Sequence, residues 1–211
     1  MAASRNSRGL GRPSRQQLQQ RKLYIVVGEG EITEKEYFAL FDNRPSEYRL
    51  IYVSLRNHHG GNTNELVKEM NKQVNKHSSP SVAAPTEYWI VADVERAETA
   101  RDLNPLFRWV QRSPNNHLGL TNRQFENWLL LHFQKGMASE HPARDLNKYI
   151  QGFGEKSKHI RGKILLEHVS TALANAKTSN VITTDKPNGT QDIPLNHTSL
   201  PRLIQSLVGN D

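Results

Sequence analysis

The chain has 211 residues and no cysteine, and its 28 Lys and Arg residues outnumber its 21 Asp and Glu residues, which gives a formal net charge of +7. This length can supply one domain with a substantial core. The lack of cysteine excludes disulfides, thiolate zinc sites and cysteine nucleophiles, so any metal would use oxygen or imidazole ligands. The sequence shows no run of about 18 apolar residues and no signal-peptide pattern, so we expect a cytoplasmic protein without a membrane association.

The positive charge is concentrated in the first 22 residues. No acidic residue precedes Glu29, whereas six basic residues do: Arg5, Arg8, Arg12, Arg15, Arg21 and Lys22. Without these six, 22 basic residues stand against 21 acidic ones, a charge of +1. We therefore expect residues 1–21 to be a disordered basic leader and residues 22–211 to form a single domain. The leader could contact the phosphates of a nucleic acid, or it could serve only for solubility.

The first half of the chain alternates between predicted strands and helices. Residues 22–27 (KLYIVV) are typical of a strand buried on both faces, and Gly28-Glu29-Gly30 ends it. A helix is predicted from Thr33, where Thr33 and Glu36 fit a capping box. The elements predicted after it are a strand at 49–55, a helix at 64–76, a strand at 88–92 and a helix at 97–112.

The second half begins with a predicted short strand at 117–120 and a buried helix at 124–133 (QFENWLLLHF). Helices dominate the remainder, apart from a long loop predicted over 177–196. This order favours an α/β fold, a doubly wound parallel sheet of about four strands with flanking helices and a mostly helical C-terminal part. Ligands of such sheets bind at the carboxyl ends of the strands.

Acidic residues fall at two of those strand ends. Glu29 follows the first strand, and Asp93 and Glu95 follow the third. If these strands are neighbours, as the usual crossover order makes them, three carboxylates converge. Clustered carboxylates repel one another unless a cation neutralises them, and hard oxygen ligands select Mg²⁺ or Mn²⁺, ions that can activate water for phosphodiester cleavage. Alternatively, these acids are ordinary turn and cap residues before helices.

Other acidic residues and a histidine lie on the predicted helices. Glu126 lies one turn into an apolar helix, where a carboxylate is costly unless it is paired or coordinating. It could be a further metal ligand, a buried partner of Arg123 or a backbone cap. We interpret His132 as a core histidine without a catalytic role. Glu31 and Glu34 flank the first turn of their helix, where they favour its dipole whatever the function.

Three motifs in this order resemble the RloB-like family. Residues 29–34 (EGEITE), followed by Tyr37 and Phe38, resemble the family's opening EGE-K-TE…YF signature. Residues 92–95 (ADVE) stand where the family typically shows D-x-D, and residues 122–133 (NRQFENWLLLHF) resemble its NPxFExWLLLHF segment. The chain departs from the pattern at Glu95, where a second aspartate is usual, and at Arg123, where proline is usual.

The resemblance implies a Toprim-like domain over residues 22–211 with a helical C-terminal extension, in a family related to OLD-type nucleases and tied to bacterial anti-phage abortive infection. A glutamate and the D-x-D pair hold the metals in such sites, which implies Glu29, Asp93 and Glu95 here. Glu95 can still coordinate, although it reaches about one methylene further. Residues 152–156 (GFGEK) resemble a later aromatic-lysine element, so Lys156 could stabilise charge on a scissile phosphate, or it could be an ordinary surface lysine.

The first functional hypothesis is a Mg²⁺- or Mn²⁺-dependent nuclease acting on DNA or RNA, tRNA included, as the effector of an anti-phage defence system. The resemblance implies a partner ATPase of the AAA or ABC type. Four residues would bind metal and, with Lys156, form the catalytic set: Glu29, Asp93, Glu95 and Glu126.

Two other hypotheses stay open. The first is a catalytically silent Toprim-like module that binds nucleic acid or recruits the ATPase, which the Glu95 departure and the near-neutral body favour. The second, phosphoryl transfer on nucleotides, ranks last because no topoisomerase tyrosine context, primase zinc motif or Walker lysine is evident.

Overall fold

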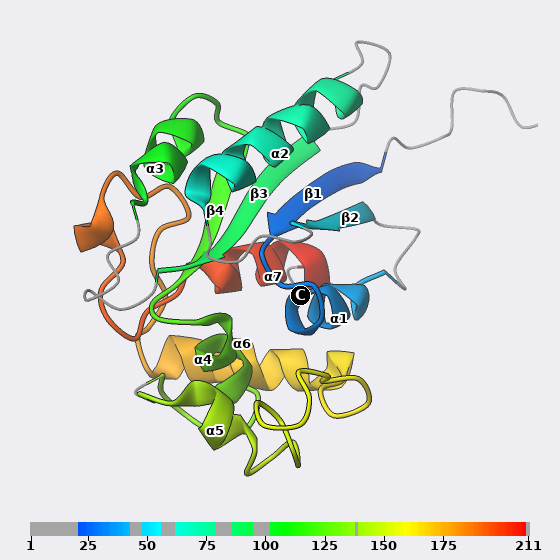
Figure 1. The fold of residues 1–211 in the computed structure, drawn as a ribbon, viewed down its shortest axis with the longest axis vertical. Coiled ribbons are helices and arrows are strands. Elements are labelled where there is room, and N and C mark those ends of the chain that lie inside the picture. The colour runs from blue at the N-terminus through cyan, green and yellow to red at the C-terminus, as the bar shows by residue number, and fades with distance from the viewer. Residues whose placement is uncertain are drawn as a thin grey trace, which may run out of the picture.

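The computed structural model describes residues 21–42, 48–55, 62–78, 86–94, 102–137 and 139–209. Within these residues the strands are β1 (Lys22–Gly28), β2 (Tyr48–Ser54), β3 (Thr86–Asp93) and β4 (Asn116–Thr121). They form one parallel sheet in the order β2-β1-β3-β4 (Figure 1). The four predicted strands are confirmed to within two residues at each end. The protein has the predicted α/β fold, and the sheet is consistent with a Toprim-like doubly wound fold.

The central strands place the carboxyl ends of β1 and β3 side by side. Val27 near the end of β1 pairs with Val53 of β2 on one side and with Ile90 of β3 on the other. All pairs are parallel, so these strands end at the same edge of the sheet. The expected crossover order is confirmed. Glu29 follows β1, and Asp93 is the last residue of the neighbouring strand β3.

Helices cover both faces of the sheet (Figure 1). Those described are α1 (Thr33–Ala39), α2 (Thr63–His77), α3 (Asn104–Val110), α4 (Phe125–Leu130), α5 (Pro142–Leu146), α6 (Val169–Thr178) and α7 (Leu200–Val208), with short 3₁₀ turns at Leu166–His168 and Thr190–Asp192. One apolar core joins α2 and α3 to one face, and a larger core joins α1, α4, α6 and α7 to the other. In the described segments, no helix combines the length and apolar character needed to cross a membrane.

The third and fourth predicted helices are shorter than expected. The prediction from 97 to 112 was wrong at residues 102–103 and 111–112, because α3 runs from Asn104 to Val110. At its start, the carboxylate of Asp102 accepts a hydrogen bond from the Asn104 amide (3.0 Å). Pro105 in the first turn explains this start, since proline belongs at a helix N-terminus. Residues 95–101 lie outside the described part. The buried helix predicted to 133 ends at Leu130 and continues as turns.

The prediction of a capping box at the start of α1 was wrong. Ile32 occupies the N-cap position and makes no side-chain cap. The Thr33 hydroxyl instead donates to the carbonyl oxygen of Lys158 (2.8 Å), and the Glu36 carboxylate accepts from the backbone amides of Ile160 (2.8 Å) and Arg161 (3.0 Å). Both side chains therefore hold a distant loop against α1 rather than satisfying the amides of their own helix.

Candidate functional site

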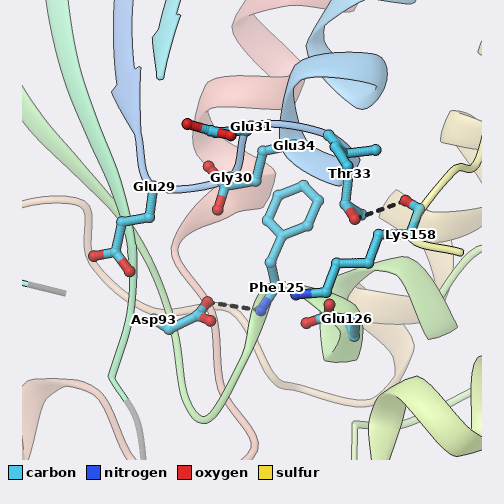
Figure 2. Close-up of a pocket in the computed structure, with 10 residues that line it drawn as sticks. Glu29, Gly30, Glu31, Thr33, Glu34, Asp93, Phe125, Glu126 and Lys158 are labelled. Carbon is cyan, nitrogen blue, oxygen red and sulfur yellow. Dashed lines mark hydrogen bonds between the residues drawn. The ribbon is translucent and has the colours of Figure 1, made fainter. Parts of the chain in front are cut away.

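An acidic pocket of about 370 Å³ lies at the carboxyl ends of β1 and β3 (Figure 2). It is formed by the turn between β1 and α1, the end of β3, the start of α4 and the loop at Lys158, which Thr33 of α1 holds. The residues that line this acidic pocket are Glu29, Gly30, Glu31, Ile32, Thr33, Glu34, Asp93, Phe125, Glu126 and Lys158. Five of these ten residues have carboxylic acid side chains.

Three of the predicted site residues meet in the acidic pocket. Figure 2 shows Glu29, Asp93 and Glu126 around it, each from a different segment of the chain. Asp93 Oδ1 accepts a hydrogen bond from the amide of Phe125 (2.8 Å), which fixes the end of β3 to the start of α4 and places Glu126 in the first turn of that helix. Glu95 lies outside the described residues.

The electrostatics of the pocket follow from burial and like charge. Burial raises the pKa of Asp93 well above its ordinary value, and the negative charges of Glu126, Glu34 and Glu29 raise it further. Glu126 and Glu29 also raise the pKa of Glu34, although burial is the larger cause there. Such a group of acids either keeps protons or requires a cation to balance its charge.

From the sequence we expected Glu34 only to favour the helix dipole, but this residue is part of the pocket. Its side chain is buried, and its Oε2 lies 2.8 Å from the Tyr52 hydroxyl, which in turn lies 2.8 Å from the carbonyl oxygen of Gly30. Burial raises the pKa of Glu34 to about 8. Because a hydroxyl carries one proton, both contacts are fully satisfied when protonated Glu34 donates to Tyr52 and Tyr52 donates to Gly30.

Two glycines make room for the Glu34 carboxyl group. A Cβ at Gly28 would lie 2.2 Å from Glu34 Oε2 and 2.6 Å from the Tyr52 hydroxyl, and a Cβ at Gly30 would lie 2.9 Å from Glu34 Cγ. The Gly-Glu-Gly turn is therefore a place where another group approaches the backbone closely. The glycine pair signals this approach in the sequence without telling which residue makes it.

The lysine that lines the pocket is Lys158 rather than the predicted Lys156. Figure 2 shows the Lys158 side chain extending toward Glu126, and Thr33 holds the Lys158 carbonyl. Lys156 is exposed, and its side chain lies beside Gly152, outside the residues that line the pocket. Sequence patterns gave no signal for Lys158, because its placement depends on a contact 125 residues distant.

His132 is confirmed as a core histidine. Its Nδ1 lies 3.1 Å from the carbonyl oxygen of Leu129, and its Nε2 lies 3.2 Å from the Tyr37 hydroxyl. A carbonyl can only accept, so Nδ1 carries the proton and Nε2 accepts from Tyr37. Burial lowers the pKa of His132 to about 4, which keeps the ring neutral at physiological pH.

The comparisons with known proteins place the chain in a family. The family model described as RloB-like protein matches residues 24–207, from within β1 to within α7, and so includes every residue that lines the acidic pocket. The chain belongs to the RloB-like family. A search of curated proteins and a search of solved structures each found no match.

The donor chemistry of this RloB-like protein fits a hard divalent cation. Glu29, Asp93 and Glu126 offer carboxylate oxygens, the ligands that Mg²⁺ and Mn²⁺ prefer, and a cation would offset the repulsion that raises the pKa of Asp93. Among the described residues, no three acidic or histidine side chains are arranged so that one ion could contact them all. Mg²⁺ tolerates this arrangement, because it usually keeps several water ligands and needs only one or two carboxylates.

Proposed function

We propose that the protein is a Mg²⁺- or Mn²⁺-dependent nuclease that hydrolyses phosphodiester bonds of DNA or RNA in the acidic pocket. The observation that carries the proposal is that Glu29, Asp93 and Glu126 come from three segments of the chain and line one hollow at the carboxyl edge of a parallel sheet. Repulsion among these carboxylates lowers the stability of the fold unless the pocket binds a cation. Membership of the RloB-like family supports the same reading.

Each side chain has a distinct role in the proposed reaction. One or two of the Glu29, Asp93 and Glu126 carboxylates would contact the ion directly and the rest would act through its water ligands, and the Phe125 amide orients the Asp93 carboxylate. When bound, the ion would supply an activated water and stabilise charge on the phosphate. Lys158 lines the same pocket and would balance negative charge on the phosphate. We retain Glu95 as a further proposed ligand and assign no direct chemistry to Lys156.

We also propose that this activity serves anti-phage defence together with an AAA- or ABC-type ATPase. The support is the family: the motifs at residues 29–34, 92–95 and 122–133 resemble those of RloB-like proteins, for which such a partnership is expected, and the family match covers all three. The ATPase would deliver the nuclease to its substrate or hold it inactive. Transfer RNA is included among the candidate substrates.

A second candidate function is a catalytically silent module that binds nucleic acid or recruits the ATPase. Two observations favour it: Glu95 replaces the second aspartate of the family's D-x-D pair, and the described side chains form no closed group of three ligands. This candidate differs from the first in one measurable respect, because it predicts binding without turnover.

The test is cleavage of DNA, tRNA and messenger RNA by the full-length protein, with the cognate ATPase present, in Mg²⁺, in Mn²⁺ and in EDTA. We expect metal-dependent cleavage that Glu29→Gln or Asp93→Asn reduces by more than about 100-fold. Losing a residue that only supports a metal ligand costs up to about 100-fold, so losing a ligand itself should cost more. Glu65→Gln on α2, on the other face of the sheet, is the matched control and should keep wild-type activity. If no substrate is cut with the ATPase present, the nuclease proposal fails.

A further inference from the structure

A second hollow of about 620 Å³ adjoins the acidic pocket. It lies between the outer side of α1 and the loop at residues 159–166, and we call it the α1 groove. Glu31 and Ile32 line both the α1 groove and the acidic pocket, so a ligand lying in one can continue into the other.

Basic residues line the α1 groove, and another from the same loop lines the acidic pocket. Lys35 of α1 and Arg161 of the loop both line it, and both are exposed. Residues 156–163 (KSKHIRGK) hold three lysines and one arginine and no acidic residue, and Lys158 from this segment lines the acidic pocket. Since the chain beyond its first 22 residues is nearly neutral, this is a local concentration of positive charge, which favours phosphate.

Apolar side chains occupy the same groove. Ile32 is 39% exposed and Leu165 is 41% exposed, among the most exposed large apolar residues described, and Leu40 and Leu166 lie beside them. Phosphate contacts account for the basic residues, whereas apolar side chains gathered in one groove favour a ligand that also has apolar faces. The unpaired bases of a single strand offer such faces, which a duplex keeps stacked inside.

The acids of the α1 groove do not cancel its charge. The Glu36 carboxylate accepts from the amides of Ile160 and Arg161 and also pairs with His159 Nδ1 (2.6 Å), contacts that lower its pKa although partial burial opposes them. Its charge is thus used to hold the basic loop in place. Glu31 lies at the border with the acidic pocket, and the four basic residues of segment 156–163 together with Lys35 outnumber Glu31 and Glu36. The Arg161 bonds use its backbone, so a change of its side chain preserves them.

We infer that the α1 groove binds a single-stranded segment of nucleic acid and leads it into the acidic pocket. Lys35 and Arg161 contact its phosphates, and Ile32 and Leu165 contact the faces of its bases. This inference rests on the proposed function for the class of substrate, and it adds which surface receives the strand and which form of nucleic acid fits it.

The test is binding of fluorescein-labelled oligothymidylate and oligouridylate to the full-length protein in EDTA, followed by anisotropy from about 50 to about 200 mM salt. The double variant Lys35→Gln, Arg161→Gln should bind more weakly. Its salt slope should fall by about 1.4, since each single-strand phosphate contact contributes about 0.7. The control Lys68→Gln, Lys76→Gln removes the same charge from exposed positions on α2 and should keep the wild-type slope. All variants retain the basic N-terminal residues.

The apolar contacts have their own variant. Leu165→Ser should lower the affinity and leave the salt slope unchanged, because it removes no charge. The inference is overturned if the Lys35 and Arg161 variant binds as tightly as wild type, if the α2 control loses as much, or if a blunt duplex competes better than the single strands. It is also overturned if the Lys35 and Arg161 variant keeps strand binding and instead loses assembly with the ATPase. That result would make the groove a protein-docking surface.

Failure of the inference and failure of the nuclease proposal give different results. If the groove variants lose binding as expected but wild type cuts nothing in Mg²⁺ or Mn²⁺, the groove assignment stands and the nuclease proposal falls. If wild type cuts in a Glu29-dependent way and the Lys35 and Arg161 variant keeps its KM for single strands, the nuclease proposal stands and the groove assignment falls.

Discussion

The carboxyl group of Glu34 lies 2.8 Å from the hydroxyl of Tyr52, and this pair connects β2 to the acidic pocket at the end of β1. Tyr52 is also 2.8 Å from the Gly30 carbonyl oxygen, so a single hydroxyl joins the buried acid to the turn that carries Glu29. The pocket thus has a protonatable group beside Glu29, Asp93 and Glu126, the acids proposed to hold the ion. In the proposed metal site, the protonation state of Glu34 would depend on whether a cation is bound.

The first prediction concerns stability against pH without metal. The folded pKa of Glu34 is raised from 4.5 to about 8, so its contribution to the free energy of unfolding is complete below about pH 4.5 and is lost as the pH rises toward 8. Asp93 acts in the same direction. Denaturant unfolding in EDTA should therefore show stability falling over this range, and Glu34→Gln should reduce the fall.

The controls for this prediction are Glu65→Gln and added Mg²⁺. Glu65→Gln on α2 should keep the wild-type pH profile. Mg²⁺ should restore stability near pH 8, because ligands bind metal only when deprotonated and the ion replaces the lost protons. If the Glu34→Gln protein kept the full wild-type dependence of stability on pH, that dependence would not come from Glu34, and the prediction would be contradicted.

The second prediction tests the space beside Glu34. Gly28→Ala should cost about 1–3 kcal/mol of unfolding free energy, the usual cost of overpacking, because the new methyl group would meet Glu34 and Tyr52. In a Glu34→Ala, Tyr52→Phe background the same change should cost less, and this double-mutant comparison isolates the collision. Equal costs in the two backgrounds would show that Gly28 is needed for another reason.

The third prediction concerns the core beneath α1. Tyr37→Phe leaves Nε2 of buried His132 without its donor, which should destabilise the fold by about 1–3 kcal/mol. Tyr149→Phe, at an exposed tyrosine bonded to Gln134, is the matched control and should change stability by no more than about 0.5 kcal/mol. Thermal and denaturant unfolding measure both. Similar effects from the two variants would argue against a structural role for the Tyr37–His132 pair.

The sheet and the neighbouring positions of Glu29 and Asp93 were predictable from the sequence because they depend on the pattern of each strand and on the parallel order of the strands. The apolar run at residues 22–27 has the length and composition of a buried parallel strand, and it is β1. The rule that parallel strands end at one edge then placed Glu29 beside Asp93, and the pocket contains both.

The parts that the sequence could not predict depend on contacts between distant residues. Thr33 and Glu36 match a capping box in sequence, but their partners lie at residues 158–161, and no local pattern shows that a loop will compete for them. Glu34 is buried because Tyr52 from another strand and the absence of a side chain at Gly28 make a place for it. The N-terminal 20 residues and Glu95 lie outside the described part, so the predictions for them stand as made.

The most direct test of the central claim is Mn²⁺ binding near pH 8, followed by the loss of the free-ion electron paramagnetic resonance signal and by competition with Mg²⁺. Wild type should bind Mn²⁺, Glu65→Gln should bind equally well, and Asp93→Asn and Glu29→Gln should bind at least about 10-fold more weakly. Wild type that binds no Mn²⁺, or variants that bind it as tightly as wild type does, would contradict a metal site in the acidic pocket.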